Sequence, residues 1–353
     1  MADRVLSTTA LGKLAVCAKQ YEYSEIDKLA PKPALLPQRI RQGLWIHRAL
    51  QYNATGRPFR LALAECVDWV VKRGLDPTKA EAIRAECERI MIGYLHYWSN
   101  KPNGIPQVVA AEIPLLHRLS PTLSIRATAD AVVQESNFLW LWEYKTTGEI
   151  PDPTWRAIDP QTALQYAAAK LSGRYDVVGI VFDYLLTEEP RVPRVKKNGE
   201  IYASDLTMTT TSECFDKAAV EISKTWNGVG LGSSFTSADE CDAYIDRMRG
   251  QLVNDGKFYQ RFKVFRPVQA VVETLRDVKV REAMLDLYER EAHYPRLNSL
   301  LYCRRFCTYR DLCPTEYTKG GIAAVMRQER FIIDDGSDRE ARDPVPQGVG
   351  AVV

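Results

Sequence analysis

The order of apolar and polar residues divides the chain into a helical beginning, a strand-rich middle and a second helical part. Apolar residues recur at helical spacing in the first hundred residues, most clearly after the Asp-Pro-Thr-Lys start at Asp76. In this part the pattern predicts helices over residues 9–21, 38–52, 59–72 and 77–100.

The residue pattern changes after Gly104, where runs rich in β-forming residues are separated by turn residues. They predict strands over residues 108–116, 123–134, 138–146 and 175–186, with an Ala-rich helix over 160–172 before the last of them. Strand, helix, strand in this order indicates a crossover connection and a mixed sheet. A basic segment with a Lys-Asn-Gly turn then predicts an exposed hairpin over 191–202. Helices are predicted over 213–226, 239–258 and 269–290.

Composition narrows the class of protein without naming a function. The chain has 353 residues, of which 46% are hydrophobic and 26% charged, as in ordinary globular proteins. Its net charge of only +2 does not by itself indicate a nucleic-acid partner. We find no membrane-spanning run and no signal peptide, so we expect a cytoplasmic protein with no membrane partner. We expect one domain over residues 1–333, with core strands at about 106–187, a helical lobe at about 205–290, a Cys-rich segment at 303–313, and a flexible tail over 334–353.

Two acidic residues and a lysine form the first candidate site. Asp130 is followed thirteen residues later by Glu143, and Lys145 comes two residues after that. Alternation along a strand puts Glu143 and Lys145 on one face, and pairing of the two strands would bring Asp130 beside them. Two carboxylates bind Mg²⁺ or Mn²⁺ and leave positions for water and a phosphate. The alternative is a cross-strand ion pair worth about 0–1 kcal/mol.

Polar residues in neighbouring elements extend this group. His47, on an early helix, could supply an imidazole ligand, and Glu112, in the preceding strand, could supply another carboxylate. A helical His and a strand Glu are also common as structural residues. Gln161 and Tyr166, on the Ala-rich helix, could contact the metal-bound water and a DNA phosphate.

Cysteines form the second candidate site. Cys303, Cys307 and Cys313 lie within eleven residues, and Cys17 lies far upstream. Four thiolates can hold Zn²⁺ or a [4Fe–4S] cluster. The other cysteines are scattered in or near predicted helices, where a free thiol usually serves as a small buried apolar group. They are Cys66, Cys87, Cys214 and Cys241.

The first set of residues resembles the PD-(D/E)xK nuclease superfamily, specifically its RecB-like branch. The resemblance rests on the segment Gly-Leu-Trp-Ile-His ending at His47, on Glu112 and Asp130, on Glu143-Tyr144-Lys145, and on the Gln/Tyr helix. It implies an α/β fold with a restriction-endonuclease-like core, in which helices flank a mixed central sheet.

The same resemblance implies roles for individual residues. His47, Asp130 and Glu143 would bind the metal, Lys145 would assist the attacking water, and the Gln/Tyr helix would contact the substrate through Gln161 and Tyr166. The family usually spaces this Gln and Tyr four residues apart, whereas here the spacing is five and Gln165 directly precedes the Tyr. Either glutamine could therefore face the site.

The cysteine pattern resembles the iron–sulfur subgroup of the RecB-like nucleases. That subgroup includes AddB-type helicase-nuclease subunits and CRISPR-associated single-strand exonucleases. The resemblance implies a [4Fe–4S] cluster that joins the N- and C-terminal segments through Cys17, Cys303, Cys307 and Cys313. The first interval of the C-terminal trio is one residue longer than the commonest Cys-x-x-Cys form. The whole resemblance covers about residues 7–315.

We therefore expect a Mg²⁺- or Mn²⁺-dependent DNA exonuclease that acts on single-stranded or unwinding ends in recombination, repair or replication. Basic residues of the predicted hairpin would bind the DNA backbone; they are Arg191, Arg194, Lys196 and Lys197. A helicase or recombinase partner and a phage origin, hence a host cytoplasm, are further expectations from the resemblance. The alternatives are a non-catalytic DNA-end-binding or adaptor subunit, and a zinc-stapled structural protein.

Overall fold

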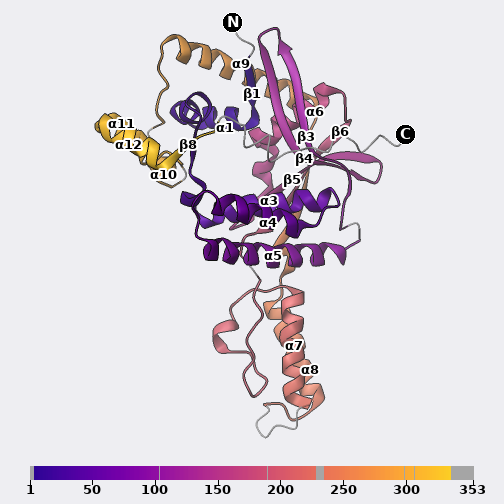
Figure 1. Ribbon diagram of the computed structural model, residues 1–353. Coiled ribbons are helices and arrows are strands. Elements are labelled where there is room, and N and C mark those ends of the chain that lie inside the picture. Colours follow the sequence, from indigo (N-terminus) through magenta and orange to yellow (C-terminus); the bar gives the residue numbers. More distant parts are fainter. Residues whose placement is uncertain are drawn as a thin grey trace.

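A mixed six-stranded sheet with helices on both faces forms the centre of the protein (Figure 1). The computed structural model describes residues 4–102, 104–188, 190–227, 234–297, 299–305 and 307–334. The predicted flexible tail, residues 334–353, therefore lies outside the described residues except for Asp334. The strands of this sheet are β1 (Arg4–Ser7), β3 (Gln107–Ser120), β4 (Leu123–Glu135), β5 (Phe138–Thr147), β6 (Val177–Leu186) and β7 (Tyr259–Phe265).

Strand β4 pairs with three other strands of the sheet. It pairs antiparallel with β3 on one side. On its other side it pairs with β1, in parallel, and further along with β5, antiparallel. Strands β5 and β6 are parallel and are joined through helix α6 (Pro160–Ser172), which confirms the predicted crossover and mixed sheet. Strand β7 pairs antiparallel with β6 at the edge.

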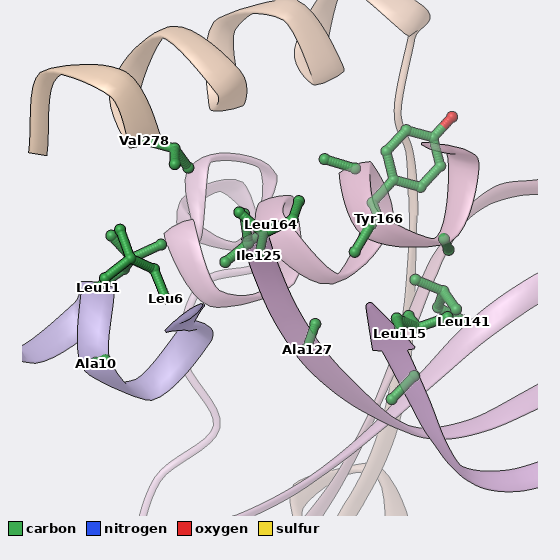
Figure 2. Close-up of a cluster of buried hydrophobic side chains, with 14 of the residues drawn as sticks. Leu6, Ala10, Leu11, Leu115, Ile125, Ala127, Leu141, Leu164, Tyr166 and Val278 are labelled. Atoms are coloured by element: carbon green, nitrogen blue, oxygen red, sulfur yellow. The ribbon is translucent and has the colours of Figure 1, made fainter. Parts of the chain in front are cut away.

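One face of the sheet is covered by helix α6 together with α1 (Thr8–Val16) and α9 (Val268–Arg290). Leu164 of α6 lies over Ile125 of β4 in the close-up of this core, with Leu11 of α1 and Val278 of α9 beside them (Figure 2). The sequence explains the position of α6 because its Ala-rich face lets the helix approach the sheet closely. Asp159 caps its N-terminus by accepting a hydrogen bond from the Thr162 amide.

The other face is covered by α3 (Gln38–Ala54), α4 (Phe59–Val71) and α5 (Pro77–Ser99). Their apolar faces meet Trp140, Trp142 and Tyr144 of β5 in a second core cluster. These three helices match the predicted ones to within two residues. Within the described residues, no helix is both long enough and apolar enough to cross a membrane.

A buried charge lies inside this second layer. Asp183 of β6 is fully buried, and its Oδ2 atom accepts hydrogen bonds from Tyr94 Oη at 2.5 Å, Arg261 Nε at 2.9 Å and Trp142 Nε1 at 3.2 Å. Burial raises the pKa of Asp183 above its usual range, although the charge of Arg261 lowers it in part. The cluster ties α5, β5, β6 and β7 together through one carboxylate.

A small lobe is inserted between β6 and β7. Its helices α7 (Ser212–Asn227) and α8 (Ala238–Leu252) pack on each other around their own apolar cluster and lie below α5 in Figure 1. The lobe is shorter than the predicted helical lobe at 205–290. Helix α8 ends at Leu252 rather than at residue 258, β7 returns to the sheet, and α9 belongs to the main core.

Two segments far apart in the sequence, residues 18–31 and 300–333, meet in a separate small unit, which we call the clasp. Strand β2 (Leu29–Pro31) pairs antiparallel with β8 (Phe331–Ile333). Tyr23, Tyr309 and Leu312 are buried beside this pair. The helices near it are α2 (Ala18–Tyr21), a π-helical turn (Glu22–Ile26), α10 (Leu300–Arg305), α11 (Leu312–Thr318) and α12 (Gly320–Arg330). The predicted helix over 9–21 is thus two helices, with a break at Cys17.

Short 3₁₀ turns complete the described secondary structure. They are Pro33–Leu35, Pro153–Ile158, Ala203–Asp205 and Asp255–Lys257.

Candidate active site

The candidate site begins where β3 and β4 both depart from regular alternation. On β4, Ala129 and Val132 belong to the core on the α6 side, whereas Ala131 belongs to the core on the α3 side. The register places Asp130 opposite Glu112 of β3, and Glu112 has a left-handed backbone with φ +49°. A left-handed conformation is unfavourable for a residue with a Cβ atom. The local kink therefore turns two carboxylates toward the same point.

Helix α3 brings an imidazole to these carboxylates. His47 Nε2 lies 2.9 Å from Asp130 Oδ2. The ligand atoms of His47, Glu112 and Asp130 all lie within 4.8 Å of one another, which is compact enough to hold one metal ion. Close approach of α3 to the end of β5 is possible because Gly43 has no side chain: a Cβ atom there would lie 2.8 Å from the Thr146 hydroxyl oxygen.

The imidazole of His47 partly offsets the negative charge of the two carboxylates. Burial lowers the pKa of His47, but the negative charge and hydrogen bond of Asp130, followed by the charges of Glu143 and Glu112, outweigh it and raise the pKa to about 9. The metal-free protein therefore carries an imidazolium between the carboxylates. The Asp130 carboxylate is also fixed by the backbone, because its Oδ2 accepts the Tyr144 amide at 2.8 Å.

Glu143 and Lys145 form the second half of the site, on the face of β5 that meets α6. Lys145 Nζ lies 2.5 Å from Glu143 Oε1. Burial and the charge of Asp130 raise the pKa of Glu143 to about 6, although Lys145 lowers it in part. Burial lowers the pKa of Lys145, but the pairing with Glu143 outweighs this and raises it above its usual value. Lys145 is therefore a cation at neutral pH.

Both candidate glutamines of α6 face Glu143. Gln161 Nε2 donates to Glu143 Oε1 at 3.1 Å, and Gln165 Nε2 donates to Glu143 Oε2 at 3.0 Å. Gln165 also donates to the Thr128 carbonyl at 2.9 Å. Residues four apart lie on one face of a helix, so this spacing is the sequence signal that identifies the pair.

Tyr166 lies elsewhere. It is buried in the core cluster that α6 shares with α1 and α9, and Figure 2 shows it on α6. Its hydroxyl donates to the Arg266 carbonyl at 2.7 Å. Tyr166 is therefore a core residue on the helix that carries the glutamines, and the structure does not bring it to the carboxylates.

The compact group differs in one residue from the metal ligands that the resemblance implies. Glu143 was expected beside His47 and Asp130, but the compact group contains Glu112 in its place. Both carboxylate oxygens of Glu143 are engaged by Lys145 and the two glutamines. Sequence alone could not rank the two glutamates, because the left-handed backbone that aims Glu112 has no signature in the residues around it.

The predicted basic hairpin is a short turn that leads into the α7–α8 lobe, closed by one bridge between Val195 and Ile201. Two of its four cations are engaged within the turn region. Arg194 pairs with Asp205 at 2.7 Å, and Lys196 pairs with Glu200 at 3.1 Å. The other two, Arg191 and Lys197, are exposed.

The four cysteines converge on one place. Cys17, in the extended break after α1, lines a cavity of about 650 Å³ together with Cys303 of α10, Cys307, and Cys313 of α11. All four are free thiols. Arg296 Nε donates to Cys313 Sγ at 3.3 Å, so a guanidinium also borders the group.

Comparison with protein families adds an independent finding. The model of the PD-(D/E)XK nuclease superfamily matches residues 5–314, which include every residue of the two candidate sites. Among curated proteins, no match is found.

Proposed function

Because the chain belongs to the PD-(D/E)XK nuclease superfamily, we propose that it is a divalent-metal-dependent deoxyribonuclease. The observation that carries the proposal is the position of His47, Glu112 and Asp130 as one compact group next to the Glu143–Lys145 pair. A metal ion held by such carboxylates can generate a hydroxide and stabilise charge on a phosphate, and a neighbouring lysine can offset further negative charge.

The donor set fits Mg²⁺ or Mn²⁺. Two carboxylates supply hard oxygen ligands, and one imidazole is also compatible with Mn²⁺. We assign His47, Glu112 and Asp130 as the nearest ligands, with Glu143 able to join them if it exchanges its Lys145 contact. A bound cation would supply Lewis-acid stabilisation of the phosphate and lower the pKa of a water molecule.

The chain's own residues then position the reactants. Lys145 is a cation held by Glu143 and lies 3.4 Å from Gln161 Oε1, so its ammonium group is fixed beside the metal ligands. There it orients the attacking water and offsets negative charge on the phosphate. Gln165 keeps Glu143 in place from the buried side.

Exonuclease action at single-stranded DNA ends is the finer part of the proposal. It is supported by the resemblance of the cysteine pattern to CRISPR-associated single-strand exonucleases. A helicase or recombinase partner would fit the same resemblance.

We further propose that Cys17, Cys303, Cys307 and Cys313 hold a [4Fe–4S] cluster. Four thiols from separate segments line one cavity of about 650 Å³, and four thiolates are the usual ligand set of such a cluster. When bound, the cluster would link the N-terminal helices to α10 and α11. In anaerobically purified protein, Cys313→Ser should remove the brown colour and lower the melting temperature, and Cys214→Ser, in the lobe, should change neither. Unchanged iron content and stability in Cys313→Ser would contradict the assignment, and stoichiometric zinc would favour the zinc-stapled alternative.

The nuclease proposal is tested with end-labelled single- and double-stranded DNA and Mg²⁺ or Mn²⁺. Wild-type protein should degrade DNA, Lys145→Ala should lose most of this activity, and Lys170→Ala should keep it. Lys170 is a matched control because it lies on α6 but pairs with the exposed Asp176. If wild-type protein binds DNA ends and leaves them intact under all these conditions, the adaptor alternative replaces the nuclease.

A further inference from the structure

Only part of the sheet is covered on the side of α3. Helices α3, α4 and α5 pack on β4 from Ala131 onward and on β5. The ribbon of β3 and β4 continues past these helices, as Figure 1 shows. Its other face is buried along this stretch, because Leu115, Ile125 and Ala127 belong to the core under α6. Among the residues that the structure describes, no element therefore covers the α3 side of the ribbon.

The residues on this side of the ribbon follow from the register. Leu116 pairs with Arg126, Pro114 with Thr128, and Arg118 with Ser124. All of them except Arg118 have at least one buried neighbour along the strand. Strand β1 adds Val5 beside Ser124 and Ser7 beside Arg126. We call these eight residues the ribbon face; they are Val5, Ser7, Pro114, Leu116, Arg118, Ser124, Arg126 and Thr128.

The chemistry of the ribbon face is cationic and apolar. It contains two arginines and no carboxylate. Leu116 is 60% exposed and Val5 is 50% exposed, so apolar surface lies between the charges. Arg126 is exposed and has no ion-pair partner among the residues that the structure describes. Such a surface attracts a polyanion and offers contact area to sugars and bases.

The ribbon face is continuous with the candidate metal site. Thr128 precedes Asp130 by two residues on β4, and Pro114 follows Glu112 by two residues on β3, so this pair is the next step along the same ribbon. At about 3.3 Å per residue, Arg126 lies about 13 Å along β4 from Asp130.

We propose that the ribbon face binds the DNA strand that runs into the metal site, with Arg126 and Arg118 on its phosphates. The inference deepens the proposed nuclease function and rests on it. DNA is favoured over a protein partner because Arg126 on this face is exposed without an ion-pair partner among the described residues, and because the face borders the site that would cut a phosphodiester. Leu116 and Val5 would contact sugars or bases, which makes binding independent of sequence.

The test measures binding of a dye-labelled single-stranded oligothymidine by anisotropy, without a divalent cation so that cleavage does not interfere. Arg126→Glu should weaken binding at least tenfold. Arg126→Ala should also lower the slope of log K against log salt by about 0.7, the value for one phosphate contact on a single strand. The matched control is Arg276→Glu, because Arg276 is exposed on α9, which covers the opposite face of the sheet, and it should bind as wild type does.

A second measurement shows where the bound DNA strand lies on the protein. A photo-cross-linking amino acid at Leu116 should attach to the oligonucleotide, and the same amino acid at Val280 of α9 should not, although both positions are 60% exposed. Wild-type affinity in Arg126→Glu, or cross-linking at Val280 instead of Leu116, would overturn the ribbon-face proposal while leaving the nuclease proposal intact. Weakened binding in Arg126→Glu, with no cleavage by wild-type protein in the presence of Mn²⁺, would support the ribbon face and reject the nuclease.

Discussion

Glu112 and Asp130 stand opposite each other on antiparallel strands and form one compact group with His47, and the backbone of Glu112 is left-handed. The arrangement concentrates two negative charges at one step of the β3–β4 ladder. A site of this kind has its geometry built into the backbone rather than into flexible side chains. Its metal affinity and its local strain can therefore be tested separately.

The first expectation concerns metal affinity. Glu112→Gln removes one anionic ligand, so we expect the affinity for Mn²⁺ to fall by roughly tenfold or more. At a fixed Mn²⁺ concentration above saturation, the metal-induced stabilisation should then shrink by about 1.4 kcal/mol for each factor of ten. Calorimetric titration measures the affinity. Glu149→Gln, at an exposed glutamate after β5, is the control, and equal affinity in the two variants would exclude Glu112 as a ligand.

The second expectation concerns strain at the same residue. Glycine normally weakens a strand relative to alanine, but it adopts a left-handed backbone without steric cost. We therefore expect Glu112→Gly to be more stable to urea than Glu112→Ala by about 1 kcal/mol. At the neighbouring Ala111, whose φ is not positive, Ala111→Gly should be destabilising. A more stable alanine variant at position 112 would show that the backbone there is not strained.

The two glutamines of α6 should separate stability from activity. Gln165 is buried and serves two acceptors, so Gln165→Ala leaves them unsatisfied and should lower the free energy of unfolding by about 1–3 kcal/mol. Gln161 is exposed, and Gln161→Ala should change the free energy of unfolding by less than about 0.5 kcal/mol while lowering the cleavage rate. Urea unfolding and a cleavage assay on both variants decide this. The assignment fails if the exposed glutamine proves the more stabilising of the two.

The buried carboxylate of Asp183 lies outside the candidate active site and should contribute to the free energy of unfolding. Asp183→Ala strands Arg261 in the interior without a counter-charge, and removal of one partner of such a pair costs about 3–5 kcal/mol. Asp176→Ala removes an exposed partner of Lys170 and should cost less than about 0.5 kcal/mol. Chemical denaturation compares them. Similar midpoints for both variants would mean that Arg261 finds water or another partner when Asp183 is lost.

Sequence pattern predicted the elements that bury a regular face. Helices α3 to α6 and strands β3 to β6 follow clear periodicities, and the placement of Glu143 and Lys145 on one face of β5 follows from alternation alone. Strand β7 was missed because its residues Gln260, Arg261 and Lys263 are polar, and Arg261 is explained only by the buried Asp183. Strand β1, with four residues, is too short for a period to be visible.

Within the site, the sequence could not show which of two candidate residues points toward the carboxylates, because this direction depends on the backbone. Glu112 turns toward His47 through its positive φ, which no neighbouring residue requires. Gln165 and Tyr166 are adjacent in sequence, and a difference of about 100° around the helix sends one to Glu143 and the other to the Arg266 carbonyl. A family spacing of Gln and Tyr was not enough to choose between them.

The clasp has a consequence for the order in which parts of the protein form during synthesis. Leu29 of β2 pairs with Ile333 of β8, so the two halves of the clasp are made about 300 residues apart. At a synthesis rate of about 5–20 residues per second, roughly 15 to 60 seconds pass between their appearance at the ribosome. Throughout that interval β2 has an open edge, and Cys17 is separated from the other cysteines of its cavity. Closure of the clasp, and any loading of that cavity, must therefore wait until β8 has been synthesised.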